Sequence, residues 1–582
     1  MTNLSPDQGA TGGFAALVTT AEPVLPSSWE FQPRVVRTIA IVAVLLIGIS
    51  FQRSEGWLAS LFIVAVTLTV GALLVLVSRR VLLAVVLAAA MVGSIHIAAY
   101  LKQQETEMLL HAYDLLSLLR SWRAVVHFCQ DYPHFAIGLV CASSAIATAG
   151  WIACRLDGMR IRRGYAAVAV VICACLAGMA AAAKGERLHT EFYLGNPYVS
   201  FFFASWSETL EALWRGQVIE AAPRADGARL ETPAGCAWTS RPPNIVLIHQ
   251  ESVVPPSHFP SLNYDRSLDP FFRSVDGQLH KLRVETYGGA SWLTEFSVLT
   301  GLSTYSFGGM RQVVQPLMRG KVQDTLPQAL ARCGYRNVAI YPMLRRYLGA
   351  GKFFEAVGLS EIFDAKDQKA KLANERDSFY YANLIAEMQR HFKSSIQPLF
   401  AYVETMATHG PHDNTYMPEV DVPGGGPGTD AGMHEYLRRL AMAAMDYRSL
   451  RAELSKRFPG QQFLIVHYGD HQPMTTWTLL GLNEDTTVEE VMRSRDSPAL
   501  ITYYAVDAVR YRPSPLPAPE TVDVPYLGTV ILEAAGLPLS DAYRERKRLM
   551  ALCDGRYFGC VERDEILKFQ RRLMDSGLIE GR

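Results

Sequence analysis

The chain has 582 residues, which is too long for one ordinary domain. Hydrophobic residues make up 49% and charged residues 19%, against about 25% charged in a typical soluble protein. The 56 basic and 56 acidic residues cancel, so no basic excess indicates nucleic acid as a partner. The apolar excess lies before residue 184, which separates an apolar first part from a globular second part.

Five apolar stretches follow a polar tail at residues 1–34. A helix needs about 20 apolar residues, with a range of roughly 17–25, to cross a bilayer. The first stretch is at the short end of that range and the other four fit it well. We therefore predict a transmembrane domain of five helices at residues 35–183. The stretches are 35–51, 57–77, 81–101, 135–154 and 165–183.

The placement of arginines predicts the orientation of these helices. Arg34 and Arg37 precede the first stretch, Arg79 and Arg80 separate the second from the third, and four more separate the fourth from the fifth. Positively charged loops stay in the cytoplasm, so these segments are expected there and everything after residue 183 outside. The four further arginines are Arg155, Arg160, Arg162 and Arg163.

Residues 184–242 are expected to form a juxtamembrane helix and a linker. Segment 198–214, like segment 108–128, mixes aromatic and aliphatic residues with a few charges. Such a segment suits a helix in the membrane interface, and it suits equally well a helix packed on the spans or on the globular part. Residues 223–243 are rich in Ala, Gly, Pro and Arg, which is typical of a linker.

After residue 242, short apolar runs alternate with helical patterns. This alternation predicts an α/β domain at residues 243–582 with a mainly parallel sheet. In such sheets ligands bind beyond the carboxyl ends of the strands. The expected strands are 244–248, 338–341, 399–403, 463–466 and 500–504, and the expected helices are 292–300, 326–333, 379–391, 435–457 and 526–535.

Polar residues at the predicted strand ends form a candidate metal-ligand set. Glu251 follows the first strand, and Asp470 and His471 follow the strand at 463–466. Carboxylate oxygens with one imidazole suit Mn²⁺ or Mg²⁺, and Zn²⁺ is possible. Charged residues at strand ends are also common in solvated turns, so the spacing alone leaves both interpretations open.

A candidate nucleophile lies at the start of a predicted helix. Ser291 follows Gly288 and Gly289, and a helix N-terminus offers N–H donors and positive potential to a phosphoryl oxygen. A bound metal would favour the alkoxide of a serine. His409 and His412, just past the strand at 399–403, could hold a leaving oxygen or protonate it. A simple helix cap explains the glycine pair equally well.

Residues 243 to about 537 resemble the sulfatase-like branch of the alkaline phosphatase superfamily, and within it lipoteichoic acid synthases and periplasmic glucan phosphoglycerol transferases. The matching pieces are NIVLIHQES, SWLTEFSVLTGL, FEAVGLSEIFD, THGPH and GDHQP, in family order. The resemblance implies an alkaline phosphatase/sulfatase-like fold. It also implies that Glu251, Ser291, Asp470 and His471 are metal ligands and that His409 binds the substrate phosphate. Five spans followed by an outer catalytic domain is the lipoteichoic acid synthase plan as well.

The sequence departs from the family at the nucleophile, which is commonly Thr. Counting back from the shared Glu295–Phe296 pair places Ser291 at that position. Thr294 is the alternative, one helical turn further on. The Cys/Ser-x-Pro-x-Arg run of true sulfatases does not surround Ser291, which argues against hydrolysis of sulfate esters.

A second departure concerns the substrate loop. The aromatic-Asn-Arg run of lipoteichoic acid synthases is not reproduced at residues 343–354, where Arg345 and Arg346 stand instead. We therefore take Arg345, Arg346, His409 and His412 as candidate substrate-binding residues. The sequence leaves the identity of the head group open.

The resemblance implies a phosphotransferase of a bacterial-type inner membrane, with its catalytic domain in the periplasm or extracellular space. It would move a phosphorylated head group, with phosphoglycerol favoured, from a membrane phospholipid to a glycan or glycolipid acceptor. The transfer would pass through a phosphoryl-enzyme ester on Ser291 and require one divalent metal, with Mn²⁺ favoured. Alternatives are a phosphoethanolamine transferase, a membrane-bound phosphodiesterase or other hydrolase of the superfamily, and a non-catalytic binding protein.

Four cysteines lie in the part of the chain expected outside the cytoplasm, where disulfides persist. Cys553 and Cys560 are seven residues apart, which predicts a disulfide that closes a small loop. Four free buried thiols are the alternative. The other two cysteines are Cys236 and Cys333.

Overall fold

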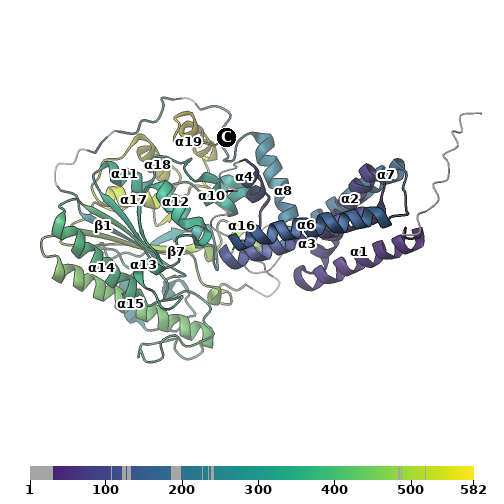
Figure 1. Ribbon diagram of the computed structural model, residues 1–582. Helices are drawn as coiled ribbons and strands as arrows, with labels where there is room; N and C mark the ends of the chain where they lie inside the picture. Colours follow the sequence, from purple (N-terminus) through teal and green to yellow (C-terminus); the bar gives the residue numbers. More distant parts are fainter. Residues whose placement is uncertain are drawn as a thin grey trace, which may run out of the picture. The chain divides into compact units, whose positions relative to one another are not determined.

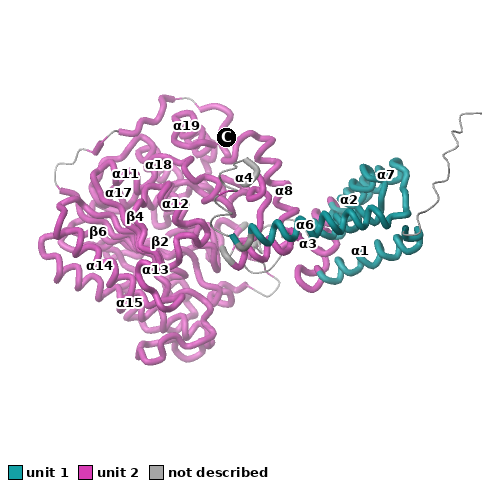
Figure 2. Tube along the Cα trace, viewed as in Figure 1, with its two compact units in different colours: residues 1–50, 64–93, 129–177 teal, residues 51–63, 94–128, 178–582 magenta. Residues whose placement is uncertain are grey.

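The computed structural model describes residues 30–582 apart from 107, 121–125, 127–132, 185–197, 226, 234, 237–240, 483–485, 487, 518 and 582. The chain forms two compact units (Figure 2). Unit 1 comprises Met1–Ser50, Val64–Gly93 and Cys129–Ala177, and unit 2 comprises Phe51–Ile63, Ser94–Phe128 and Gly178–Arg582.

The five predicted spans are helices long and apolar enough to cross a membrane (Figure 1). Each extends somewhat beyond the predicted apolar stretch, because polar flanking residues continue the helix. They are α1 (Pro33–Glu55), α2 (Trp57–Ser78), α3 (Val81–Thr106), α6 (Pro133–Leu156) and α7 (Arg163–Lys184).

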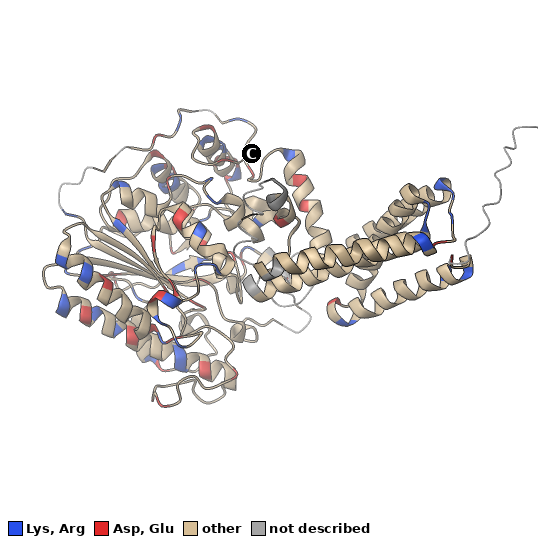
Figure 3. Cartoon of the chain, in the orientation of Figure 1, with Lys and Arg blue, Asp and Glu red and all other residues tan. Residues whose placement is uncertain are grey.

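The three basic segments lie at one end of unit 1. Arg80 is a bridge partner of Arg160, and Phe31 is a bridge partner of Asp157. The buried Asp157 carboxylate accepts a hydrogen bond from the Leu82 amide at 2.7 Å. Figure 3 shows Lys and Arg positions, in blue, at this end of the helices. These segments thus lie next to one another in unit 1, and the side of the membrane that they face stays a prediction.

Helix α8 (Tyr198–Arg215) packs against α4 (Ala112–Arg120) and the 3₁₀ segment η4 (Thr304–Val313) within unit 2. Glu55 caps the N-terminus of α8, since its carboxylate accepts hydrogen bonds from the Val199 and Ser200 amides at 2.8 and 3.0 Å. The segment predicted at 198–214 is thus a helix with one face packed against α4 and η4. The prediction at 108–128 coincides with α4 in part and lies partly outside the described residues.

A single mixed sheet of eight strands forms the centre of unit 2, in the order β4-β3-β5-β1-β6-β7-β2-β8. Strands β4, β3, β5, β1 and β6 are parallel, β7 is antiparallel to β6, and β2 is antiparallel to β7. The strands are β1 (Asn244–Gln250), β2 (His280–Arg283), β3 (Arg336–Ile340), β4 (Glu361–Phe363), β5 (Leu399–Thr405), β6 (Phe463–Gly469), β7 (Ile501–Val509) and β8 (Thr521–Asp523).

Helices cover both faces of this sheet (Figure 1). The long pair α14 (Asp377–Ser394) and α15 (Ala431–Arg457) packs on one face through an apolar core that includes Val246 and Ile248 of β1. The remaining α-helices of the domain are α9 (Ser291–Thr300), α10 (Val314–Met318), α11 (Leu326–Arg332), α12 (Ala350–Val357), α13 (Ala365–Gln368), α16 (Val488–Arg493), α17 (Leu527–Ala534), α18 (Asp541–Leu552) and α19 (Arg563–Asp575).

Two disulfides cross-link the globular part of the chain. Cys553 pairs with Cys560, which confirms the predicted small loop. Cys236 pairs with Cys333 across a sequence separation of 97 residues, so the linker is tied covalently to the sheet domain between α11 and β3.

Candidate active site

The order of the strands brings the predicted ligands together. Strand β1 pairs in parallel with β5 on one side and β6 on the other, and Gln250 lies beside both Thr405 and Gly469. Parallel strands end at the same edge of a sheet. The residues that follow these three strands, Glu251, Met406 and Asp470, therefore emerge side by side.

Glu251, Asp470 and His471 form one buried cluster at this edge, since they are 4%, 0% and 2% exposed. His471 Nε2 lies 3.1 Å from Glu251 Oε1 and 3.4 Å from Asp470 Oδ2. His471 Nδ1 is 3.0 Å from the Gln472 carbonyl oxygen, and donation to that oxygen orients the ring so that Nε2 faces the carboxylates. Asp470 Oδ1 accepts hydrogen bonds from the Ser252 and His471 amides, both at 2.7 Å.

Ser291 completes this cluster from the first position of α9. Its Oγ donates to Glu251 Oε2 at 2.8 Å and lies 3.4 Å from His471 Nε2. Ala290 and Gly288, with φ of 63° and 72°, make the tight turn into the helix. A Cβ on Gly288 would come within 2.3 Å of the Met474 sulfur, so this close approach requires glycine. The partly buried Ser291 is more accessible than the three residues that surround it.

Thr294, the alternative nucleophile, is fully buried. Its hydroxyl donates to the main-chain carbonyl oxygen of Asp470 at 2.8 Å. The threonine thus holds α9 against the turn that carries Asp470, while Ser291 directs its hydroxyl into the carboxylate cluster.

The cluster attracts positive charge. Burial alone would raise the pKa of Glu251, but His471 holds it well below its usual value. Burial alone would lower the pKa of His471, but Asp470 and Glu251 raise it to about 9. Asp470 Oδ2 accepts no well-aligned hydrogen bond from the described part of the chain. A buried carboxylate oxygen left in this state is costly, and a divalent cation with oxygen and imidazole donors fits the set formed by Glu251, Ser291, Asp470 and His471.

His249 is a member of this region that the sequence analysis missed. Its Nε2 lies 3.2 Å from Asp470 Oδ2, and its Nδ1 lies 2.9 and 3.0 Å from the hydroxyls of Tyr468 and Tyr402. His249, Glu251 and Asp470 could also share a cation by their geometry. The available signal was a histidine in a strand whose seven residues are all buried.

A second pair of carboxyls lies next to His249. Glu295 and Glu404 each offer an oxygen within 4.8 Å of that ring and of each other. Burial and then Glu295 raise the pKa of Glu404 well above its ordinary value, so this carboxyl is neutral where Glu251 is charged. Tyr402 and Gln315 donate hydrogen bonds to Glu295 at 3.3 and 3.0 Å.

His409 and His412 lie on the loop that follows β5. His409 is half-buried and close enough to Glu251 for its charge to lower the pKa of that carboxyl. Arg439, which the sequence analysis also missed, donates to the His409 carbonyl oxygen at 2.8 Å. His412 is buried, with Nε2 3.0 Å from the Thr408 carbonyl oxygen. Burial and then Arg439 lower the pKa of His412 to about 4, so its ring is neutral near pH 7.

The two predicted substrate arginines differ in their surroundings. Arg345 pairs with Asp367 at 2.5 Å and lies 3.4 Å from Asp364. Arg346 is exposed at the start of the next turn. Both arginines are exposed, and Arg345 is in addition paired with carboxylates near β4.

Residues 243–496 match the protein-family model described as Sulfatase. This part of the chain is thus similar to the sulfatase family. The chain is 24% identical over 335 residues to an uncharacterised protein of Haemophilus influenzae, and the match covers 53% of this chain and 56% of that protein. The chain thus spans about half the length of this curated relative.

Two solved structures are among those to which this chain is similar. One is a phosphoglycerol transferase of Streptococcus pyogenes in complex with sn-glycerol-1-phosphate, which is 16% identical, with 58% of this chain and 87% of that chain covered and a TM-score of 0.45. The other is the integral membrane lipooligosaccharide phosphoethanolamine transferase A of Neisseria meningitidis, which is 10% identical, with 87% and 96% covered and a TM-score of 0.38.

Proposed function

We propose that this protein is a membrane-anchored, metal-dependent phosphotransferase that moves the head group of a phospholipid, with phosphoglycerol favoured, to a glycan or glycolipid. The observation that carries the proposal is the Ser291 hydroxyl, which is partly accessible, begins a helix and donates to the buried Glu251 at 2.8 Å. A serine in that position is both an activated nucleophile and the first donor of a helix N-terminus that favours anions.

In the first step, Ser291 Oγ attacks the phosphorus of the donor phosphodiester. The serine proton leaves along its hydrogen bond to Glu251, the Oγ–P bond forms, and the bond from phosphorus to the diacylglycerol oxygen breaks. His409 protonates that departing oxygen. Glu251 releases this proton to solvent once the adduct has formed. In the second step an acceptor hydroxyl attacks phosphorus and gives its proton to His409, the P–Oγ bond breaks, and Ser291 takes a proton from solvent.

Glu251, Ser291, Asp470 and His471 would hold one divalent ion, with Mn²⁺ favoured over Mg²⁺ and Zn²⁺. When bound, the ion would lower the pKa of the serine hydroxyl and offset charge on the phosphoryl oxygens. The residues themselves supply the remaining positioning, since Asp470 is fixed by the amides of Ser252 and His471. Arg346 and His409 are the proposed contacts to the transferred head group.

The proposed topology places residues 1–34 in the cytoplasm and the domain at residues 243–582 outside it, in a bacterial-type inner membrane. The arginine-rich segments that meet at one end of unit 1 support this orientation. A β-lactamase fused to the C-terminus should confer resistance, because that enzyme protects only from the periplasm. A fusion that is produced in full but gives no resistance would reverse the topology.

Product analysis tests the reaction itself. Purified protein with Mn²⁺, phosphatidylglycerol vesicles and an envelope glycan extract should release diacylglycerol and add glycerophosphate to the glycan. Parallel vesicles of phosphatidylethanolamine show which head group is used. Release of free glycerophosphate at the same rate with and without the extract would make the protein a hydrolase and overturn the proposal.

A further inference from the structure

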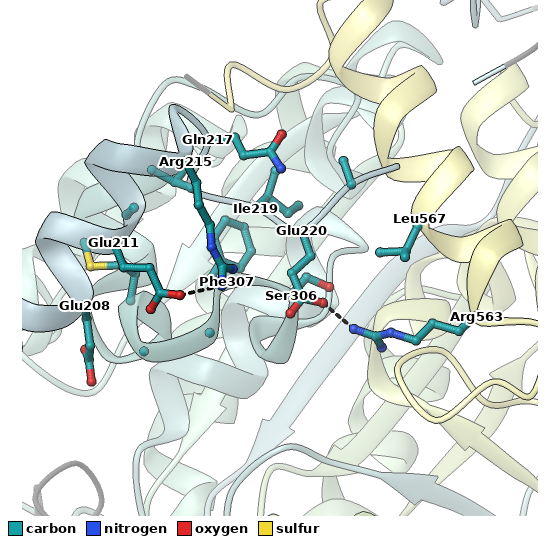
Figure 4. A pocket seen from close by; sticks show the side chains of 16 residues that line it. Glu208, Glu211, Arg215, Gln217, Ile219, Glu220, Ser306, Phe307, Arg563 and Leu567 are labelled. Atoms are coloured by element: carbon teal, nitrogen blue, oxygen red, sulfur yellow. Dashed lines mark hydrogen bonds and ion pairs between the residues drawn. The ribbon is translucent and has the colours of Figure 1, made fainter. Parts of the chain in front are cut away.

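A cavity of about 490 Å³ lies between α8, the chain that follows it, η4 and α19, all in unit 2 (Figure 4). This volume is within the range of small-molecule sites, roughly 300–1,000 Å³. It is distinct from the strand-end cluster, because none of Glu251, Ser291, Asp470 or His471 is among the residues that line it.

The charges around this cavity are paired. Arg215 forms an ion pair with Glu211 on α8, and Arg563 of α19 forms one with Glu220 of the opposite wall (Figure 4). With Glu208, three carboxylates face two guanidinium groups, which leaves one net negative charge among the described lining residues. A lining of this sign disfavours a phosphodiester or another anion.

Main-chain hydrogen bonds hold the walls of the cavity together. The main-chain amide of Glu220 donates to the Ser306 carbonyl oxygen at 2.8 Å, and that of Ala222 donates to the Leu567 carbonyl oxygen at 3.0 Å. Gly309 allows the closest approach of α8, since a Cβ there would lie 2.2 Å from the Glu208 carboxyl carbon. The cavity is therefore preformed, which reduces the cost of ordering it around a ligand.

The η4 wall of the cavity contacts α9, the helix that begins with the proposed nucleophile Ser291. Phe307 of η4 lines the cavity and packs against Phe296 of α9 with ring centroids 5.6 Å apart. Trp292, next to Ser291, donates from its indole to the Gln312 carbonyl oxygen at 3.3 Å. At its other end, α8 is capped by Glu55 of the first span. Helix α8 thus contacts η4 at the cavity and Glu55 at its N-terminus.

We propose that this cavity is an acceptor subsite that binds neutral, polyhydroxylated sugar units of a glycan. Hydroxyl groups both donate and accept hydrogen bonds, so they can bridge the Arg215–Glu211 and Arg563–Glu220 pairs without adding charge. Phe307 and Leu567 offer apolar surface to the C–H faces of a sugar ring. The inference rests on the proposed transfer reaction, since it assigns the acceptor class to that reaction.

Two variants test this subsite without touching the strand-end cluster. Glu220→Gln combined with Arg563→Gln removes one ion pair and leaves the net charge of the cavity unchanged. Ala212→Phe fills the cavity and removes no polar group. The matched control is Glu453→Gln combined with Arg457→Gln, which removes an exposed ion pair on α15.

The full-length protein in detergent is assayed in two steps. The first is formation of the head-group adduct on the protein from phosphatidylglycerol vesicles without acceptor. The second is transfer to envelope glycans extracted from cells that lack the gene, separated by anion exchange into neutral and anionic pools. We expect the neutral pool to be the acceptor, and both cavity variants to raise its KM at least about tenfold, which corresponds to about 1.4 kcal/mol. Adduct formation and the control should match the wild type.

The subsite would be overturned by an unchanged acceptor KM in both variants or by transfer only to the anionic pool. Slower adduct formation in both variants would also overturn it, because it would assign the cavity to binding of the phospholipid donor. The proposed function fails in a different way, because the wild-type protein would then form no adduct.

Discussion

The strand-end cluster of Glu251, Ser291, Asp470 and His471 and the cavity beside α8 both contain carboxylates. The groups that balance their negative charge differ between the two regions. At the strand ends Glu251 and Asp470 are buried and are held by imidazoles, a hydroxyl and main-chain amides. Around the cavity two glutamates pair with arginines on walls that are partly exposed. The first region presents buried carboxylates that suit a cation, whereas the second pairs two of its three carboxylates with arginines and offers paired donors and acceptors that suit an uncharged ligand.

The largest expected effect comes from removing a carboxylate at the strand ends. Asp470→Ala should lose the bound divalent metal and reduce transfer by a factor on the order of 10³ or more. Elemental analysis of the purified variant, with the Glu453→Gln variant as control, measures the metal. Wild-type occupancy in Asp470→Ala would contradict the assignment of the ligands.

A smaller loss is expected from the residue behind Asp470. His249→Phe removes the ring nitrogen that lies 3.2 Å from Asp470 Oδ2, and groups that orient a metal ligand are typically worth about 10–100-fold in metal affinity. Competition with a chelator measures that affinity. Tyr468→Phe, which removes only a hydroxyl on the far side of the ring, should weaken the metal less. Equal affinity in wild type and His249→Phe would show that the histidine does not position Asp470.

Glu404→Gln should preserve metal and activity, because burial and Glu295 raise the pKa of Glu404 and keep its carboxyl neutral. A carboxyl whose pKa is raised by folding stabilises the native state at pH values below its unfolded pKa of about 4.3. This stabilisation is lost as the pH rises toward the folded pKa. The glutamine variant lacks this dependence. Its melting temperature, compared with that of the wild type, should therefore become more favourable as the pH rises above about 5. A variant that loses its metal would instead make Glu404 a charged partner of the cation.

The smallest effect is expected at Gly309. A methyl group there would meet the end of the Glu208 side chain, which can move aside at low cost. Gly309→Ala should therefore raise the acceptor KM a few-fold with little change in melting temperature. A large fall in adduct formation would show that the cavity wall and the nucleophile helix cannot be treated as separate regions.

The sequence predicted the architecture well where the signal was local. The five spans, the parallel strands β1, β3, β5 and β6, and the start of α9 were recognisable from apolar runs and glycines. Strands β2, β4 and β8 were missed because they have only four, three and three residues. The antiparallel direction of β7 was missed because it depends on a pairing with β6 that no local pattern records.

The candidate site was predictable as a set of strand-end residues but not as a network. Glu251, Asp470 and His471 follow strands that are adjacent in the sheet, and Ser291 was found through its glycines. His249, Glu404 and Arg439 act through neighbours distant in sequence, such as Asp470, Glu295 and the His409 carbonyl oxygen. The cavity beside α8 combines segments more than 300 residues apart, Glu220 and Arg563 among them, so no local sequence pattern indicates it.

The central claim is that Ser291 is the nucleophile. Protein incubated with phosphatidylglycerol vesicles and Mn²⁺, without acceptor, should carry a glycerophosphoryl group that peptide mass spectrometry assigns to Ser291. Ser291→Ala should carry none and should release no diacylglycerol, while Thr294→Ser, which keeps the buried hydroxyl bonded to the Asp470 carbonyl oxygen, should be labelled like the wild type. A label on residue 294, or full diacylglycerol release by Ser291→Ala, would contradict the account.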